Sequence, residues 1–579
     1  MCGIIGFIGY DIALMYLLNG LKQLQNRGYD SAGVCLLNDI LDIKLNKYAS
    51  TEEKNAIELL EESFNETNAQ LGIGHTRWAT HGPKTDINSH PHMDMYNKII
   101  LVHNGIIENY LELKSFLKKE GYVFKSQTDT EVIVNLLSYF YKENENIYES
   151  INKTINKLNG TYALCILFRD CPDKLFCVRH GSPLLVGIND NFAIVASEQS
   201  GFCGNVNSYI CLENNDICIL KKENNKISMK THKTYIDHKL IFSKNELTPG
   251  IYEHWTLKEI NDQIESSKRA ISFGGRLLDN NKVKLGGLQE QIDILKRIDN
   301  IIFLGCGTSY YAGLLGIKYF KDLCKFNTVQ IFDGADFTEK DIPKVGHTAL
   351  ILLSQSGETK DLHRCIKIGK ETDTFLIGVI NVVDSMIARE VNCGCYLNAG
   401  REVAVASTKA FTSQCIILSM MAIWFAQIKS INLNKRLQYI KDLRRLYLDI
   451  DNFLKNVNDP CNKVLKVFNN RNSVFLLGKG GSEAIAKEGS LKIKEISYIH
   501  AEGYSASSLK HGPFGLLDKG FPVILIDPIN EYSSKMGNVY EEVKSRYAEV
   551  ITITDNEKCK RDNVIYIESN KSYSELLSI

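Results

Sequence analysis

A buried strand, a glycine-rich turn and a helix of small residues follow one another twice in the second half of the chain. The first copy reads IDNIIFLGCGTSYYAGLLGIKYF and the second reads RNSVFLLGKGGSEAIAKEGSLKIKEI. The first turn glycines of the two copies, Gly305 and Gly478, lie 173 residues apart. A repeat of this size predicts two similar α/β domains, each a doubly wound, mostly parallel sheet covered by helices.

The two glycine turns do not fit the dinucleotide-binding pattern. Tyr310 and Glu483 stand where GxGxxG would need its last glycine. Backbone N–H groups at the start of each following helix can still hold a phosphate.

The first 240 residues follow a different pattern. Short β-type runs such as KIILVHNG and TYALCILF alternate with helical spacing in YLELKSFLKKEGY and TEVIVNLLSYFYKE. The polar stretch 221–239 predicts a surface strand pair or loop. At 579 residues the chain is too long for one core, and about three to four domains are expected. We expect an N-terminal domain over 1–240, a linker over 241–284, and the two repeat domains over 285–445 and 446–579.

Charge and cysteine usage exclude several classes of protein. Lys and Arg together number 68, as do Asp and Glu, which argues against a broad nucleic-acid or membrane-surface footprint. The sixteen cysteines include no C-x-x-C pair of the kind found in zinc ribbons or thioredoxin sites, and Cys393 with Cys395 is a weak signal. We expect buried free thiols, no metal site and a reducing compartment.

The chain start and the longest apolar run bear on location. No basic residue precedes Lys22, and Asp11 interrupts the first apolar stretch, so we expect no signal peptide. The run CIILSMMAIWFA over 415–426 is too short to span a bilayer and predicts a buried helix. These features predict a cytoplasmic protein with neither a membrane nor a nucleic-acid partner.

Cys2 directly follows the initiator methionine, which is a poor position for a structural cysteine because chain ends fray. Removal of Met1 would leave an α-amine beside the thiol, and that amine can serve as the base for a nucleophile. Polar residues also gather in short segments that local structure does not require. These segments are RGYDSAG at 27–33, GHTRWATHG at 74–82, NSHPH at 88–92, VHNGIIEN at 102–109 and QTDTE at 127–131.

The polar segments can supply the other parts of a site that cleaves an amide. An Asn104-Gly105 turn can offer a side-chain NH2 and a backbone N–H to an oxyanion. Arg77 and Asp129 suit the carboxylate and amine of a free amino acid. Each residue also has a structural interpretation: a hairpin turn, a surface ion pair for Arg77 and a helix N-cap for Asp129. Their combination behind Cys2 favours the catalytic interpretation.

The segments CGIIG, RGYDSAG, GHTRWATHG, HNGIIEN and TDTE resemble the signature segments of class II glutamine amidotransferases, whose nucleophile is an N-terminal cysteine. The resemblance implies an αββα sandwich of the N-terminal-nucleophile hydrolase type. It also implies that Cys2 attacks the glutamine carboxamide, forms a thioester and releases ammonia. By the same resemblance Asn104 and Gly105 form the oxyanion hole, Arg77, Thr80 and His81 bind the glutamine carboxylate side, Asp129 binds its α-amine, and Trp78 gates ammonia transfer.

Ser and Thr cluster at three glycine turns or helix starts of the first repeat domain, in GCGTS, LLSQSGET and VASTKAF. Hydroxyls and backbone N–H groups at helix starts suit a phosphate held without a metal. No HExxH, DxD or Walker-type pattern accompanies them. One such turn alone would be read as a plain N-cap. Three in one α/β domain favour a phosphosugar.

The segment KEGSLKIKEISYIHAE has helical spacing and carries charges on one face. Glu488 and Lys492 are four residues apart, and Lys492 and Glu495 are three apart. Surface ion pairs are a common explanation, but the other faces are apolar and predict a covered helix. A carboxylate beside an ammonium is then a poised acid/base pair. His511 precedes Gly-Pro at a predicted sharp turn, where its ring can reach a ligand.

From residue 2 to the end, and in the same domain order, these segments resemble the isomerizing glutamine:fructose-6-phosphate aminotransferase family with its paired sugar-isomerase (SIS) domains. The resemblance implies conversion of glutamine and fructose 6-phosphate into glutamate and glucosamine 6-phosphate, the first step of hexosamine and UDP-N-acetylglucosamine synthesis, by a homodimer without a cofactor. Glu495 would move a proton between C1 and C2, Lys492 would support it, and His511 would open the sugar ring from the other subunit. The implied sugar-phosphate site consists of Gly307, Thr308, Ser309, Ser354, Gln355, Ser356, Thr359, Val405 and Ser407.

Three alternatives stay open at this point. A phosphoribosyl-pyrophosphate amidotransferase lacks support, because no acidic pyrophosphate-site motif follows the first domain. A sugar-phosphate-binding protein without chemistry is opposed by the presence of Cys2 and Glu495. The third is a glutaminase with an impaired synthase site, because the family chain continues beyond Ile579 into a helix and a tail that carries a Schiff-base lysine. Lys571 precedes that helix and is not a convincing substitute.

Overall fold

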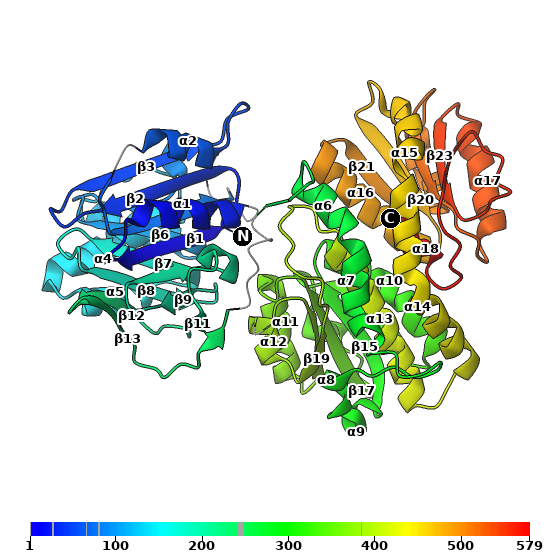
Figure 1. The fold of residues 1–579 in the computed structure, drawn as a ribbon, viewed down its shortest axis with the longest axis horizontal. Coiled ribbons are helices and arrows are strands. Elements are labelled where there is room, and N and C mark those ends of the chain that lie inside the picture. The colour runs from blue at the N-terminus through cyan, green and yellow to red at the C-terminus, as the bar shows by residue number, and fades with distance from the viewer. Residues whose placement is uncertain (1, 26–27, 65–66, 79–81, 241–247, 384) are drawn as a thin grey trace. The chain divides into compact units, whose positions relative to one another are not determined.

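The computed structural model describes residues 2–25, 28–64, 67–78, 82–240, 248–383 and 385–579. The chain forms two compact units, 1–250 and 251–579. Each unit is described by itself below (Figure 1).

Two antiparallel sheets form the centre of the first unit. Their strand orders are β14-β11-β9-β10-β1-β4-β2-β3 and β13-β12-β8-β7-β6-β5. The strands of the first sheet are β1 (Gly3–Gly9), β2 (Ser31–Leu37), β3 (Ile43–Ala49), β4 (Leu71–Arg77), β9 (Leu185–Ile188), β10 (Phe192–Ala196), β11 (Ser208–Cys211) and β14 (His238–Lys239). Those of the second are β5 (His92–Met93), β6 (Ile99–Ile107), β7 (Gly160–Phe168), β8 (Lys174–His180), β12 (Cys218–Glu223) and β13 (Lys226–Lys230).

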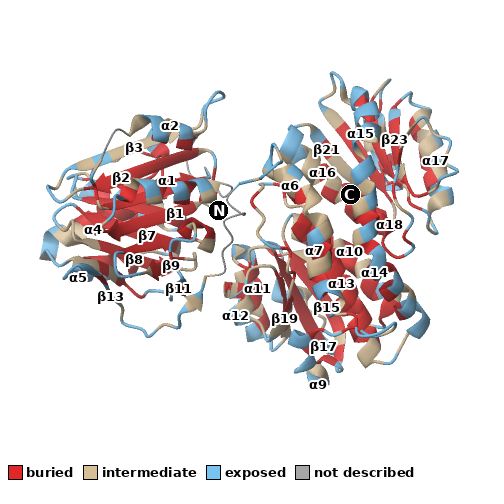
Figure 2. Cartoon of the chain, in the orientation of Figure 1, coloured by how far each residue is buried: buried red, intermediate tan, exposed pale blue. Residues whose placement is uncertain are grey.

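The layers follow from the alternation of side chains along each strand. In β1, Ile4 and Ile8 belong to the core between the sheets, while Ile5 and Phe7 belong to a second core on the outer face. Helices α1 (Ala13–Leu24) and α2 (Ala56–Ser63) complete that outer core. On the other sheet, α3 (Tyr110–Lys119), α4 (Asp129–Asn144) and α5 (Ile147–Ile155) cover the outer face. The predicted αββα sandwich is confirmed (Figure 2).

The predicted local elements of this unit are also present. The two helical patterns correspond to α3 and α4, and the polar stretch 221–239 contains the β12–β13 hairpin. Asn104 and Gly105, predicted as a turn, instead lie inside strand β6, where they pair with Ala163 and Tyr162 of β7. Gly105 has φ +138°, and a Cβ there would lie 2.0 Å from the carbonyl oxygen of Thr161, so only glycine fits.

The second unit contains two parallel five-stranded sheets with the orders β16-β15-β17-β18-β19 and β21-β20-β22-β23-β24. Because the two orders are equivalent, the predicted internal repeat is confirmed. The first sheet consists of β15 (Ile298–Gly305), β16 (Thr328–Asp333), β17 (His347–Ser354), β18 (Phe375–Ile380) and β19 (Cys393–Tyr396). The second consists of β20 (Ser473–Gly478), β21 (His500–Ser505), β22 (Pro522–Ile526), β23 (Glu549–Thr554) and β24 (Asn563–Tyr566).

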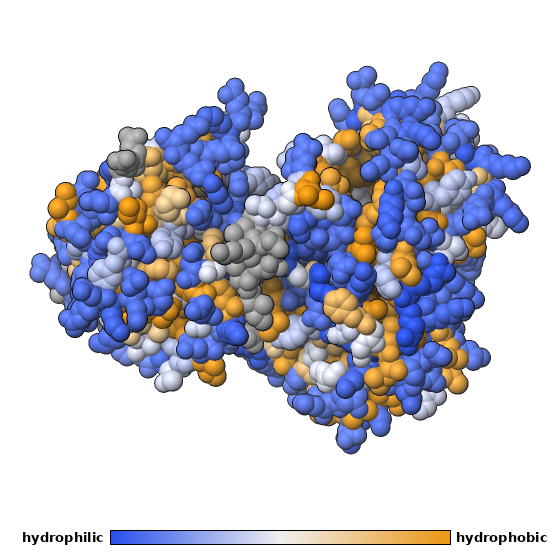
Figure 3. Space-filling view, viewed as in Figure 1, coloured by the Kyte–Doolittle hydropathy of each residue, from blue (hydrophilic) through white to orange (hydrophobic). Residues whose placement is uncertain are grey.

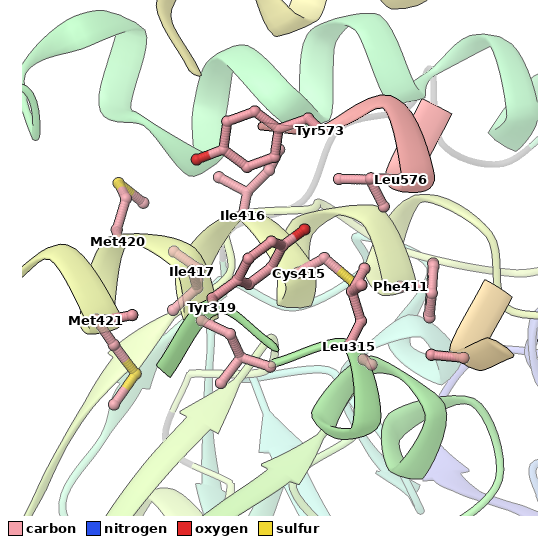
Figure 4. Close-up of a cluster of buried hydrophobic side chains, with 14 of the residues drawn as sticks. Leu315, Tyr319, Phe411, Cys415, Ile416, Ile417, Met420, Met421, Tyr573 and Leu576 are labelled. Carbon is pink, nitrogen blue, oxygen red and sulfur yellow. The ribbon is translucent and has the colours of Figure 1, made fainter. Parts of the chain in front are cut away.

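Helices cover both faces of each parallel sheet. One large core joins the two sheets and the helices between them, and smaller cores lie beneath α11, α12 and α17. The helices are α10 (Thr308–Leu323), α11 (Lys360–Glu371), α12 (Met386–Glu390), α13 (Lys409–Ile428), α14 (Leu433–Asn456), α15 (Asn458–Val464), α16 (Gly481–Ser497), α17 (Ser533–Lys544) and α18 (Ser574–Leu577). Figure 4 shows Leu315 and Tyr319 of α10 packed in the large core together with side chains of α13 and with Tyr573 and Leu576 near the chain end.

Helix α13 contains the apolar run 415–426, and its burial confirms the predicted core helix. The helix is longer than that run because the buried polar residues at its start have half-buried partners: Lys409 pairs with Asp262, and Thr412 bonds to Gln263. At 20 residues it is long and apolar enough to cross a membrane by length and composition alone, which corrects the expectation of a run too short to do so. Within the described chain it is the one such helix, and 89% of its most apolar 18-residue stretch is buried in the core.

The range 241–284, predicted as a linker, carries two helices, α6 (Trp255–Asn261) and α7 (Gln263–Ala270), ahead of the short helices α8 (Gly286–Gln289) and α9 (Ile292–Leu295). Ala270 and Leu277 of this stretch belong to the large core. All sixteen cysteines are free thiols, and none is exposed. On the surface drawn in Figure 3, hydrophobic residues are scattered among hydrophilic ones.

Candidate active sites

Cys2 lies at the start of β1, half-buried, against the end of β4. Its Sγ accepts the backbone N–H of Trp78 at 3.2 Å, and its carbonyl accepts Nδ2 of Asn104 at 2.8 Å. Burial raises the pKa of the Cys2 thiol, and the Trp78 N–H and the charge of Arg77 oppose that rise only in part. The thiol therefore favours its protonated form at neutral pH, and a nucleophilic role requires a nearby base.

Two candidate glutamine-binding residues are buried beside this cysteine. Arg77 is the last residue of β4, and burial lowers the pKa of its guanidinium. Asp129 is the first residue of α4, and its Oδ2 accepts the N–H of Ile107 at 2.9 Å. Arg77 is buried and is therefore not part of a surface ion pair. Asp129 is not the helix N-cap, because Thr128 caps α4 through the N–H of Glu131.

Trp78 is 38% exposed, and the edge of its ring meets Tyr29 with centroids 5.2 Å apart. Thr80 and His81, the other two predicted glutamine-binding residues, lie outside the described residues.

Four buried histidines form a connected group next to Asn104, and the sequence predicted no role for any of them. The ring of His75 stacks on that of His90 at 4.1 Å, and His90 meets His92 at 4.9 Å. Thr130 Oγ1 lies within hydrogen-bond distance of His90 Nε2 and His103 Nδ1. Burial lowers the pKa of His75 to about 3 and that of His90 and His92 well below the usual value. These rings are neutral at physiological pH.

The second group of residues lies where β15 ends and α10 begins. Gly307 precedes α10 with φ +55°, and a Cβ built on it would meet nothing within 4 Å, so this turn is open. Thr308, the first residue of α10, donates from Oγ1 to Glu488 Oε1 at 3.1 Å and accepts from Lys492 Nζ at 3.0 Å. Glu488 and Lys492 belong to α16 of the other repeat domain, so the two domains meet at this threonine.

The charged face of α16 is arranged as the spacing predicted. Lys492 Nζ lies 3.4 Å from Glu488 and 2.7 Å from Glu495. Glu488 is 1% exposed, and its Oε2 has no hydrogen-bond partner in the described parts of the chain. Burial raises the pKa of Glu488 to about 7, although Lys492 and Thr308 act in the opposite direction. The sequence predicted that Glu488 shares this face of a covered helix with Lys492, but the family resemblance assigned catalytic roles only to Lys492 and Glu495.

A second polar turn follows β17, the neighbour of β15 in the sheet. Ser354 Oγ accepts the N–H of Gly357 at 2.9 Å and lies 2.8 Å from Thr359 Oγ1. Ser356 Oγ accepts the N–H of Glu358 at 3.2 Å, and Gln355 lies half-buried between the two serines. The cap residues of α10, α11 and α13 make no side-chain capping bond, which is evidence against plain N-caps at these three helix starts.

The third segment, 401–408, is held by two carboxylates. Glu402 accepts from Ser407 Oγ at 2.7 Å and from the N–H of Thr408 at 2.8 Å. The fully buried Glu259 of α6 accepts the N–H groups of Val403 and Ala404, and burial raises its pKa to about 7. Neither glutamate was identified from the sequence. Val405, which follows Ala404 in this segment, is exposed.

A cavity of about 370 Å³ connects this segment with α16. Its polar lining includes Ser407, Thr408, Glu488 and Lys492, and most of the remaining lining is apolar and includes Ile579. Ser309 also reaches into the neighbourhood of α13, since its Oγ accepts Gln414 Nε2 at 2.9 Å. Of the predicted sugar-site residues, 307–309 and 354–359 follow the carboxyl ends of the adjacent parallel strands β15 and β17, where open α/β sheets bind ligands. Val405 and Ser407 lie in the segment before α13.

Unlike Lys492, the predicted ring-opening residue His511 is not bonded to the group at Thr308 within the described part of one chain. It lies in the 3₁₀ turn Ser508–His511 and is exposed. Within the described part of one chain, no hydrogen bond or ion pair joins it to Thr308 or Lys492. In the same described ranges, no group of three or more His, Cys, Asp or Glu side chains could hold a metal ion.

Comparison with known protein families divides the chain in the same order as the structure. The model of the glutamine amidotransferase domain matches residues 75–203, and the model of the SIS domain matches 294–424 and 467–572. A probable glutamine–fructose-6-phosphate aminotransferase (isomerizing) of Acanthamoeba polyphaga mimivirus is 42% identical over 100% of this chain and 95% of its own. The enzyme of that name from Thermococcus kodakarensis is 38% identical over 100% of this chain and 94% of its own.

The chain belongs to the isomerizing glutamine–fructose-6-phosphate aminotransferase family. Among solved structures, the C-terminal domain of glucosamine-fructose-6-phosphate aminotransferase from Francisella tularensis matches with a TM-score of 0.54 at 28% identity. That match covers 57% of this chain and 93% of the other. The family membership confirms the resemblance drawn from the motifs.

Proposed function

We propose that this chain converts glutamine and fructose 6-phosphate into glutamate and glucosamine 6-phosphate. One contact supports the synthase reaction in particular. Thr308, at the open turn before α10, bonds to Lys492 and Glu488 of the other SIS domain. A protein that only hydrolysed glutamine would have no use for this charged group. A glutaminase-only chain is therefore not favoured, in agreement with relatives of the synthase name that match the whole chain.

In the first unit, the proposed reaction begins at Cys2 after removal of Met1. The freed α-amine takes the thiol proton, and Sγ attacks the carboxamide carbon of glutamine. The C–S bond forms, the C–N bond breaks, and the proton leaves with ammonia. Asn104 Nδ2 and the Gly105 N–H stabilise the oxyanion, and water then hydrolyses the thioester to glutamate. Arg77, with Thr80 and His81, holds the carboxylate side of glutamine, Asp129 holds its α-amine, and Trp78 gates the ammonia.

In the second unit, the proposed phosphate site is the set of turns described above, from Gly307 to Ser309, from Ser354 to Thr359, and at Val405 and Ser407. Ammonia condenses with the C2 carbonyl of the open-chain sugar and releases water. Glu495 then moves a proton from C1 to C2, and the proton of the C1 hydroxyl passes to the nitrogen, which yields the 2-amino aldose; Lys492 supports the transfer between the carbons. The exposed His511 opens the sugar ring of the other subunit in this proposal, so the working form is a homodimer.

We also propose a cytoplasmic location and a division of the chain into an N-terminal domain, a linker and two SIS domains over 1–240, 241–284, 285–445 and 446–579. Free, unexposed thiols suit a reducing compartment.

The direct test is to supply glutamine and fructose 6-phosphate and to measure glutamate and glucosamine 6-phosphate. We expect a product ratio near one for the wild-type chain. Cys2→Ala should abolish glutamate release and leave fructose 6-phosphate binding intact, whereas Cys559→Ala, a half-buried cysteine of the second unit, should change neither. Glutamate release by Cys2→Ala at the wild-type rate would exclude the proposed nucleophile.

A further inference from the structure

The side-chain amide of Asn104 is bonded at both ends inside the first unit. Its Nδ2 donates to the carbonyl oxygen of Cys2 at 2.8 Å, and its Oδ1 lies 3.0 Å from Nε2 of His75. Asn104 is 6% exposed and His75 is fully buried, so water does not replace these partners. Only one of the two possible amide orientations satisfies both contacts.

A backbone carbonyl decides the tautomer of His75. The same Nε2 lies 3.0 Å from the carbonyl oxygen of His103, which can only accept a hydrogen bond. Nε2 must therefore carry the proton, and it shares this proton between the His103 carbonyl and Asn104 Oδ1. Nδ1 of His75 has no hydrogen-bond partner among the described residues and is the unprotonated nitrogen.

The amide orientation follows from that tautomer. With Nε2–H facing Asn104, the amide must present its oxygen to His75 and its NH2 group to Cys2. One N–H of that group is bonded to the Cys2 carbonyl, and the other remains for a ligand. If His75 were absent, only the bond to the Cys2 carbonyl would oppose a 180° rotation of the amide, which would turn an acceptor oxygen toward the cysteine and repel an oxyanion.

The surroundings keep His75 in this single state. Its ring stacks on the ring of His90 with an interplanar angle of 25°. Arg77 and His103 are close enough to disfavour a second positive charge, and burial disfavours it more strongly. A neutral ring without a bond to the thiol cannot act as the general base for Cys2.

We propose that His75 is a positioning residue of the glutaminase site, which aims the Asn104 NH2 group at the oxyanion through its Nε2–H. This inference rests on the proposed function of Cys2 and Asn104. It assigns a task to a buried histidine that touches neither the nucleophile nor the glutamine-binding residues Arg77 and Asp129 through any hydrogen bond described.

The test compares two substitutions of His75 with one of His92. His75→Met removes the donor at nearly constant volume, and His75→Gln keeps an N–H near the position of Nε2. His92→Gln is the matched control, because His92 is equally buried but bonds to Thr128 rather than to Asn104. We expect kcat for glutamine hydrolysis to fall roughly 10- to 100-fold in His75→Met, less than the 10²–10³ typical for loss of an oxyanion donor. We expect near wild-type values in His75→Gln and His92→Gln, and an unchanged KM throughout.

Alkylation of Cys2 by iodoacetamide separates positioning from a merely structural effect. That reaction needs the thiol but develops no oxyanion, so its rate should stay the same in all folded variants. In an Asn104→Ala background, His75→Met should cause no further loss of kcat, because His75 acts only through Asn104. Equal kcat losses in His75→Met and His92→Gln, or a further loss in the Asn104→Ala background, would overturn the proposal.

If His75→Met does not fold, His75→Gln still tests whether His75 positions the Asn104 amide. A folded His75→Gln protein with normal alkylation but a kcat as low as that of Asn104→Ala would contradict the inference. If the wild-type chain is alkylated at Cys2 but hydrolyses no glutamine, the proposed function itself is wrong.

Discussion

The two SIS domains share one architecture but have different turns. Both sheets have equivalent strand orders, and the turn glycines have nearly the same conformation, with φ, ψ of 55°, −126° at Gly307 and 64°, −127° at Gly480. A Cβ on Gly307 would meet open space, whereas a Cβ on Gly480 would lie 2.4 Å from the ring of Tyr532. The second turn is thus filled by the domain's own side chains.

The two domains contribute different parts to the group of side chains at Thr308. In the second domain, Lys479 bonds to Ser507 and lies over the Tyr532 ring at 5.8 Å, so its turn is closed by internal contacts. The helix after that turn, α16, instead presents Glu488 and Lys492 to Thr308 of the first domain. A duplicated fold can therefore supply a cradle from one copy and charged groups from the other.

Removal of the charge on Lys492 should have the largest effect on this division. We expect Lys492→Met to lower synthesis of glucosamine 6-phosphate about 10²- to 10⁴-fold, the usual range for general acid–base groups. Glutamine hydrolysis should persist, because no contact of the first unit is changed. Lys494→Met, on an exposed position of the same helix, is the control. A loss as large in the control as in Lys492→Met would show that helix stability, not the charge, is responsible.

Substitutions in the turn after β17 should weaken sugar-phosphate binding. Ser356→Ala and Thr359→Ala should each cost about 1–3 kcal/mol of affinity for fructose 6-phosphate, the range for hydrogen bonds to a charged group. Ser507→Ala removes the bond to Lys479 of the closed turn in the second domain and should leave the affinity unchanged. Calorimetry with and without a chelator measures these effects, and a dependence on metal would argue against this site.

The buried carboxyl of Glu488 should make stability depend on pH. Its pKa is raised to about 7 in the folded protein from an ordinary value of 4.5, so the folded state binds more protons than the unfolded state between these values. Stability therefore decreases as pH rises through this window. Glu488→Gln should flatten that part of the profile and raise Tm at pH 8 by roughly 2–4 °C per kcal/mol recovered. A variant with the wild-type slope between pH 4.5 and 7 would rule out Glu488 as the cause.

The smallest effect concerns the two glycines themselves. Both have positive φ, so alanine is strained at either position by about 1–2 kcal/mol. Gly480→Ala carries the additional clash with Tyr532 and should lower Tm more than Gly307→Ala. The pair Gly480→Ala, Tyr532→Ala should recover the difference. Equal Tm values for the two single variants would mean that the second turn is as open as the first.

The sequence predicted the features that depend on neighbours along the chain. The repeat of strand, glycine turn and helix predicted both parallel sheets, and the spacing of Glu488, Lys492 and Glu495 predicted their contacts. Contacts between distant segments carry no such signal. Nothing in the sequence links Lys492 to Thr308, or Tyr532 to Gly480.

In the first unit, the same limit explains what was missed. Cys2, Arg77 and Asp129 were identified through their segments, but the tautomer of His75 depends on a carbonyl of another strand. The helices within 241–284 were also missed, because their packing faces are short and mostly polar.

We predict that only the first SIS domain binds the phosphate of fructose 6-phosphate. Equilibrium dialysis of the full chain with radiolabelled fructose 6-phosphate measures this most directly. We predict one bound molecule per chain, lost at the same ligand concentration in a Ser356→Ala, Thr359→Ala variant and kept in a Lys479→Met, Ser507→Ala variant. Binding of two molecules per chain would contradict this prediction. Binding that persists in the first variant and is lost in the second would contradict it as well.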